Sequence, residues 1–309
     1  MKKKFIRLLA VALTLALVNP ALVSANEIPA VEQVDLNQIV NVKATLLNTM
    51  LQSTSTQYAM IDNGEMILSG QVGAYSKSEN KALTSETMYG IGSISKVYVA
   101  ASVMKLVDAG KIDLDTPLTT YIPEFKMKDE RYKDITPRML LNHSSGLMGS
   151  SFEDAFLLGD ADTYAVDSFL TQLENQRLKA DPGAYSVYCN DGFTLAQILV
   201  ERVSEMDFTS FINENFLNPL GLNHTKTPLD AFDRNSIAKA YHPYYNGELP
   251  VDSVNVIGTG GIYATATDLC KFAQTFMHDG ANLLSENALN AMETSEAKKG
   301  YGFQKEIVL

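Results

Sequence analysis

The sequence contains little cysteine. Its 309 residues include two, Cys189 and Cys270. Two cysteines cannot build a disulfide framework, and their spacing is not that of a metal site. In an oxidising compartment they would either form a single bridge or remain as two free thiols. The sequence implies neither a metal nor an organic cofactor.

Positive charge is also scarce. There are 25 Lys and Arg against 36 Asp and Glu, which gives a formal net charge of −11. Such an acidic chain is repelled by nucleic acid and by anionic membrane surfaces, so we expect neither as a partner. The hydrophobic content of 46% suits one large domain, or two interleaved ones, with a substantial core.

Long apolar runs are missing except at the N-terminus. There, MKKKFIRLLAVALTLALVNPALVSANE combines four basic residues, an apolar run and small residues before Asn26, which predicts a signal peptide over residues 1–25. An uncleaved anchor is the alternative, but the run is short for a membrane-spanning helix. No cysteine follows the predicted cut, which argues against a lipid anchor. We expect a protein that is secreted or held in the cell envelope, without a stable membrane anchor after cleavage.

The remaining pattern predicts an α+β fold. Residues 26–41 are expected to be a tether and residues 42–309 a single domain, with Asn63-Gly64 as the turn of a hairpin. An antiparallel sheet built from both ends of the chain would be flanked by helices, with a large helical region inserted between them. Only residues 301–309 remain for return strands, so we expect the C-terminal strands to be missing. Helices are predicted over 42–53, 193–206, 208–216 and 267–278, mainly helix over 150–179, and strands over 58–61, 65–74 and 259–264.

The stretch YGIGSISKVYVAASVMKLVDAG places Ser93 and Lys96 where a glycine-rich segment becomes an apolar-periodic helix. Residues three apart share one face of a helix. The free N–H groups and the positive end of the helix dipole lie at the same place. A hydroxyl, an amine and donors for an oxyanion would therefore converge. Taken alone, the pattern is far more often that of a serine N-cap followed by a solvated lysine.

Other arrangements that activate a serine are absent. The sequence has no G-x-S-x-G element and no suitably placed His-Asp pair, so Lys96 is the candidate base if it is partly desolvated. Tyr188 could pass a proton to a leaving group, and Asn190 could orient Lys96 and a substrate amide. The alternative for both is a turn and cap before the next helix. His143 is a further candidate base.

Four stretches carry a resemblance to a known family. They are GSISK, LLNHSSGL, PGAYSVYCNDGFTLAQILVERV and GTGGIYATATDLCKFAQTFM. In this order and at these separations they resemble the serine β-lactamase and penicillin-binding-protein superfamily, in its class C β-lactamase and D,D-peptidase branch. The resemblance implies a β-lactamase/transpeptidase-like fold with Ser93 as nucleophile, assisted by Lys96, Tyr188 and Asn190. It assigns a structural role to the loop that contains His143.

The sequence departs from the family at its third motif. No K-[ST]-G occurs, and Lys298-Lys299-Gly300 is expected to be a solvated loop. Two hypotheses follow. The first is an exported serine hydrolase that acts through an acyl-enzyme on D-Ala-D-Ala peptides of peptidoglycan, on β-lactams or on small amides and esters. The second is a shortened, catalytically inactive protein that binds cell-wall peptide or a partner, and a covalent adduct on Ser93 would separate the two.

Overall fold

The computed structural model describes residues 35–158 and 161–294. The chain divides into two units, Met1–Leu36 and Asn37–Leu309, and the fold described is that of the second. The predicted signal peptide, residues 26–34 of the predicted tether, the expected loop at Lys298-Lys299-Gly300 and residues 301–309 lie outside the described residues.

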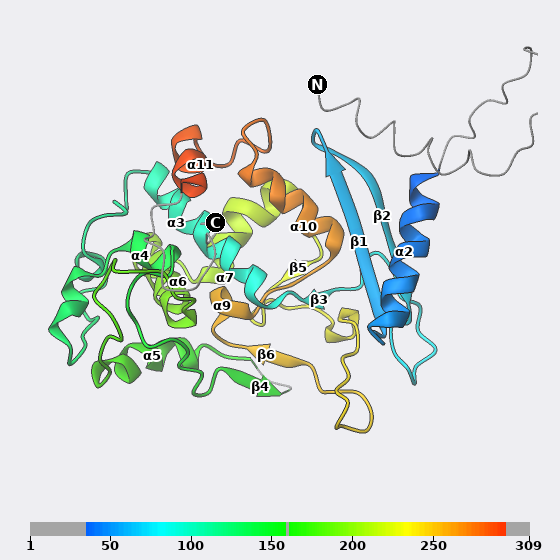
Figure 1. The fold of residues 1–309 in the computed structure, drawn as a ribbon, viewed down its shortest axis with the longest axis horizontal. Coiled ribbons are helices and arrows are strands. Elements are labelled where there is room, and N and C mark those ends of the chain that lie inside the picture. The colour runs from blue at the N-terminus through cyan, green and yellow to red at the C-terminus, as the bar shows by residue number, and fades with distance from the viewer. Residues whose placement is uncertain (1–34, 159–160, 295–309) are drawn as a thin grey trace, which may run out of the picture. The chain divides into compact units, whose positions relative to one another are not determined.

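Helices and short antiparallel sheets together give an α+β fold, as predicted (Figure 1). The sheets pair β1 with β2, β3 with β7 and β7 with β5, and β4 with β6. The helices are α2 (Leu36–Met50), α3 (Ser95–Asp108), α4 (Pro137–Leu141), α5 (Tyr164–Glu174), α6 (Asn190–Ser204), α7 (Phe208–Ile212), α8 (Asn218–Leu220), α9 (Ile257–Gly260), α10 (Ala266–Ala273) and α11 (Glu286–Glu293). The strands are β1 (Ser55–Asp62), β2 (Glu65–Gly73), β3 (Tyr89–Gly90), β4 (Phe156–Leu158), β5 (Thr225–Lys226), β6 (Asp252–Val254) and β7 (Tyr263–Ala264).

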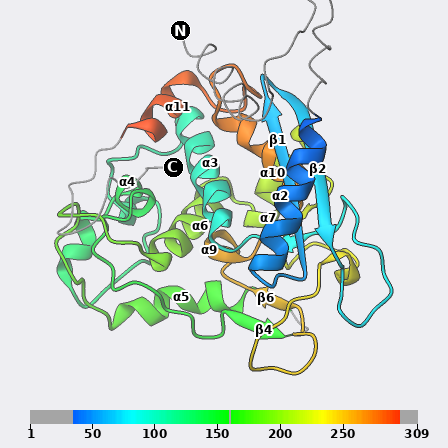
Figure 2. The same ribbon diagram turned by 45° about the vertical axis from the view of Figure 1, so that its right-hand side comes forward.

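The β1–β2 hairpin confirms the predicted turn. Asn63 and Gly64 have φ angles of 49° and 80°, and two adjacent positive φ angles are what a type I′ turn requires. Helix α2 lies beside the hairpin (Figures 1 and 2), where Thr56 Oγ1 donates to Asn48 Oδ1 at 3.0 Å. This helix begins at Leu36, six residues earlier than expected, so the last part of the predicted tether is helical.

The sheet β3–β7–β5 brings two distant motifs together. Tyr89 pairs with Ala264, and the N–H of Ile91 donates to Ile262 O at 2.9 Å. The segment that leads into Ser93 therefore lies beside the segment that follows α9. The strand predicted over 259–264 is shorter than expected, because residues up to Gly260 fold as the short helix α9 and only two residues pair as β7.

The region 150–179 is less helical than predicted. Strand β4 pairs with β6, in the register Phe156↔Val254 to Leu158↔Asp252, and the main helix here is α5. The strand forms because a partner far along the chain supplies its hydrogen bonds, which local periodicity does not reveal.

Helix α3 is the centre of the core. Ten of its residues are buried, and it packs against α6 and α9 (Figure 2). The ring of Tyr98 stacks on that of Phe272 with centroids 3.7 Å apart, and Phe216 meets Phe272 edge-on. Because α3 is buried along most of its length, the segment at its N-terminus is held on a rigid support.

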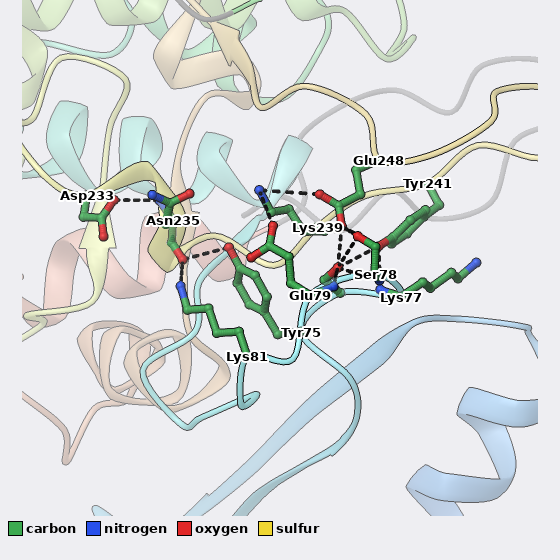
Figure 3. Close-up of polar contacts among 11 residues, drawn as sticks. Tyr75, Lys77, Ser78, Glu79, Lys81, Asp233, Asn235, Lys239, Tyr241 and Glu248 are labelled. Carbon is green, nitrogen blue, oxygen red and sulfur yellow. Dashed lines mark hydrogen bonds and ion pairs between the residues drawn. The ribbon is translucent and has the colours of Figure 1, made fainter.

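A carboxylate ties the segment after β2 to the segment before β6 (Figure 3). Glu248 accepts hydrogen bonds from the hydroxyls of Ser76, Ser78 and Tyr241, and Lys239 Nζ lies 3.7 Å from its other oxygen. These bonds, with that from Ser76 first, lower the pKa of Glu248 to about 2. The carboxylate therefore stays charged and keeps the two segments joined above that pH.

Gly258 is expected to be essential for the close approach of α9 to α3. A Cβ at this position would lie 2.3 Å from Val99 Cγ2, and Val99 is fully buried. Overpacking of this kind typically costs about 1–3 kcal/mol. Gly258→Ala should therefore lower the urea midpoint, whereas Gly260→Ala, whose Cβ would have its nearest neighbour at 3.8 Å, should change it little. Equal midpoints for the two variants would contradict this packing.

Candidate active site

Ser93 lies immediately before α3, as the sequence predicts. It is exposed and belongs to a 3₁₀ turn, Gly92–Ile94, that leads directly into the helix. The next residue but one, Ser95, is fully buried, and its Oγ accepts a hydrogen bond of 3.1 Å from the N–H of Ile262. The serine hydroxyl is thus exposed on a turn whose two flanks, at Ile91 and Ser95, are both hydrogen-bonded to Ile262.

Lys96 is a buried residue, so the alternative of a solvated lysine is wrong. Only 4% of it is exposed, and its Nζ lies 3.3 Å from Ser93 Oγ and 2.7 Å from the carbonyl oxygen of Thr259. Burial lowers the pKa of Lys96, because an ammonium loses its hydration there. An amine with a lowered pKa next to a hydroxyl is suited to accept a proton.

Tyr188 approaches Ser93 from the other side. Its hydroxyl donates to Ser93 Oγ at 2.8 Å, and half of the residue is exposed. The ring of His143 lies 4.7 Å from the ring of Tyr188, and His143 Nδ1 accepts a hydrogen bond of 3.1 Å from the N–H of Cys189. His143 therefore supports the segment that carries the tyrosine.

Asn190, the first residue of α6, lies in the same pocket but makes different contacts from those expected. Its side-chain amide donates to Ser150 Oγ at 2.8 Å, and its backbone carbonyl accepts from Thr259 Oγ1 at 3.3 Å. The expected contact with Lys96 is therefore replaced by an indirect one, since Thr259 touches both residues.

Two further residues of the site, Thr259 and Ser150, are not predicted from the sequence. Thr259 holds Lys96 through its carbonyl, and its own hydroxyl shares a hydrogen bond of 3.0 Å with Thr194 of α6. The preceding N–H, of Gly258, donates to Gln197 Oε1 at 2.8 Å. The GTGG stretch was a visible signal, but a backbone carbonyl has no side-chain signature. Ser150 lies in a serine pair after Gly149, with nothing to mark it as a partner of Asn190.

A pocket of about 320 Å³ opens at Ser93. Gly260 at the end of α9 and Gly261 after it form one wall, Phe152 and Phe156 supply apolar surface, and Asp252 adds a negative charge. Within the described residues, no cluster of three or more His, Cys, Asp and Glu side chains is placed to hold a metal ion. Cys189, which is buried, and Cys270 are both free thiols.

The sequence matches a known family over most of its length. The family model described as Beta-lactamase matches residues 45–306. The chain belongs to the β-lactamase family. Its membership agrees with the resemblance carried by the four sequence stretches, and with the α+β fold.

Individual relatives of this β-lactamase family member are distant. It is 26% identical over 254 residues to "Putative penicillin-binding protein PbpX" of Bacillus subtilis (strain 168), which covers 79% of this chain and 59% of that protein. It is 27% identical over 219 residues to "Penicillin-binding protein 4" of Amycolatopsis lactamdurans, covering 67% and 55%. The chain thus spans less than two thirds of the length of both relatives.

The fold likeness extends to solved structures. One titled "A class C beta-lactamase" superposes with a TM-score of 0.71 at 21% identity, covering 84% of this chain and 70% of that one. In the part of the chain that the structure describes, no helix combines the length and hydrophobicity needed to cross a membrane.

Tyr188→Phe is expected to slow the reaction of Ser93 with a 4-nitrophenyl ester. The change removes the hydroxyl that donates to Ser93 Oγ but keeps the ring beside His143. Loss of a proton carrier typically costs about 10²–10⁴ in rate, so kcat should fall while KM changes little. Tyr185→Phe, at a nearby exposed tyrosine, is the matched control. A kcat equal to that of the parent would exclude the Tyr188 hydroxyl from the chemistry.

Proposed function

We propose that this protein is an exported serine hydrolase that acts through an acyl-enzyme at Ser93. One observation carries the proposal: Ser93 Oγ lies within 3.3 Å of a buried lysine amine and 2.8 Å from a tyrosine hydroxyl. A serine hydroxyl is a poor nucleophile until a base takes its proton, and these two groups are the ones in contact with it.

The proposed reaction has two halves. Ser93 Oγ attacks the carbonyl carbon of the substrate, and its proton passes to the neutral amine of Lys96. The backbone N–H of Ser93 stabilises the oxyanion that forms. The bond to the leaving group then breaks, and that group takes the proton, by way of Tyr188. Water, activated by the same groups, hydrolyses the ester on Ser93 and regenerates the hydroxyl.

Asn190 has a positioning role in the proposal. Its side-chain amide, held by Ser150, faces the pocket and would contact the carbonyl or N–H of a substrate amide. The proposed substrates are D-Ala-D-Ala peptides of peptidoglycan, β-lactams, or small amides and esters. The names of the relatives, which are called penicillin-binding proteins, support β-lactams, and the basic and apolar N-terminal segment supports a location outside the cytoplasm.

Covalent labelling of Ser93 tests the proposal. The full chain is incubated separately with a fluorescent penicillin, a 4-nitrophenyl ester and a fluorophosphonate, and intact-mass spectrometry reports the adduct. We expect one adduct per chain, lost in Ser93→Ala and retained in Ser69→Ala, which removes an exposed serine on β2.

An adduct that persists in Ser93→Ala would contradict the assignment of the nucleophile. A folded parent protein that reacts with none of the three probes would contradict hydrolase function. It would favour the non-catalytic binding protein instead.

A further inference from the structure

A second pocket adjoins the catalytic one. It has a volume of about 800 Å³ and is lined by the segment around Ser150 and by residues just after α5. Ser150 lines this second pocket, and Asn190 lines the catalytic one with Ser93. The hydrogen bond of 2.8 Å between Asn190 and Ser150 therefore marks the border of the two pockets. A substrate amide held at Asn190 would have one end directed toward the second pocket.

The second pocket is lined by cations that have no partner. Lys128 and Arg177 are exposed, and within the described parts of the chain their side chains make no hydrogen bond or ion pair. A third cation is close, because Lys179 Nζ lies 3.5 Å from the carbonyl oxygen of Met148, another lining residue.

The two carboxylates that line the same pocket are already engaged. Asp129 receives a two-pronged ion pair from Arg131, with Nη2 at 2.6 Å, and a hydrogen bond from the N–H of Leu178. Asp191 is 1% exposed, and it accepts from the N–H of Ser151 at 2.6 Å. Arg131 therefore neutralises the charge of Asp129, and neutral groups of Ser151 hydrogen-bond the buried Asp191. Lys128 and Arg177, in contrast, have no ion-pair partner within the described residues.

The cations of the second pocket stand out against the negative charge of the rest of the chain. A chain with a net charge of −11 repels anions in general, and the catalytic pocket itself carries Asp252. A negatively charged substrate group would thus be disfavoured beside Asp252 and favoured beside Lys128 and Arg177. The difference in charge between the two pockets would therefore orient a substrate that carries a negative group.

We propose that the second pocket binds a carboxylate on the acyl side of the substrate, through Lys128 and Arg177. The preferred substrates are then acyl donors, such as acidic peptides, whose acyl part carries a negative charge a short distance from the scissile carbonyl. The inference rests on the proposed hydrolase function and adds its substrate class.

Two esters that differ by one charge test the inference. The 4-nitrophenyl esters of N-glutaryl-glycine and N-glutaramoyl-glycine have the same length and leaving group, but the first ends in a carboxylate and the second in a carboxamide. Exposed ion pairs are weak and are screened by salt. We therefore expect kcat/KM at low salt to favour the glutaryl ester by about threefold to tenfold, and the preference to shrink as salt is added.

The double variant Lys128→Gln with Arg177→Gln should lose this preference while hydrolysing the neutral ester normally. Lys43→Gln with Lys126→Gln removes the same net charge from exposed positions outside the pocket, and should retain the preference. If the ratio of kcat/KM for the glutaryl ester to kcat/KM for the glutaramoyl ester is the same in the parent and in the pocket variant, the inference is overturned. Even then, the proposed function would still hold if the parent hydrolyses the neutral ester and Ser93→Ala does not.

Binding separates the two proposals if turnover fails. Absence of any hydrolysis that depends on Ser93 would overturn the proposed function. The glycinamides of the same two acyl groups are then titrated into the Ser93→Ala protein by calorimetry. Tighter binding of the glutaryl compound, lost in the pocket variant, would support the anionic site, and equal binding would overturn it.

Discussion

The site depends on one buried amine. Lys96 Nζ lies between Ser93 Oγ and the carbonyl oxygen of Thr259, and only 4% of the residue is exposed. Taking an ammonium out of water costs free energy, so the surroundings favour the neutral amine more than solvent would. The pKa of Lys96 depends on its hydrogen-bond partner as well as on its burial. A carboxylate at this place would stabilise the charged form and raise the pKa of Lys96, whereas a neutral carbonyl orients the amine with a weaker preference for charge.

The rest of the fold holds that carbonyl in place. Helix α9 lies against α3 and α6, where the absence of a side chain at Gly258 leaves room for Val99. Gln197 and Thr194, both on α6, bond to the N–H of Gly258 and to the hydroxyl of Thr259. Since α6 also begins at Asn190, two residues after Tyr188, a single helix fixes the support of Lys96 and both other residues of the proposed site. The buried helix α3 in turn fixes the position of Ser93, which lies just before its first residue.

Sequence reasoning succeeded where a pattern is local. The hairpin at Asn63-Gly64 and the helix after Ser93 follow from turn chemistry and periodicity, and the contacts of Lys96 and Tyr188 with Ser93 agree with what the family resemblance implies. It failed where distant segments meet. Strand β4 exists only because β6 pairs with it, and the contact of Lys96 with Thr259 uses a backbone atom. Lys128 and Arg177 share a pocket with Ser150 only through the fold, because more than 20 residues separate each of them from Ser150 in the sequence.

The pH dependence of Ser93 labelling tests the central claim most directly. The rate of fluorophosphonate labelling should rise with pH as Lys96 loses its proton, and level off above the pKa of that amine. Because burial lowers this pKa, the midpoint should lie below the ordinary lysine value of 10.5, and the rise should vanish in Lys96→Ala. Circular dichroism of both proteins confirms that each is folded over the range. A midpoint at or above the ordinary lysine value, or an unchanged profile in Lys96→Ala, would contradict a buried neutral amine as the group that activates Ser93.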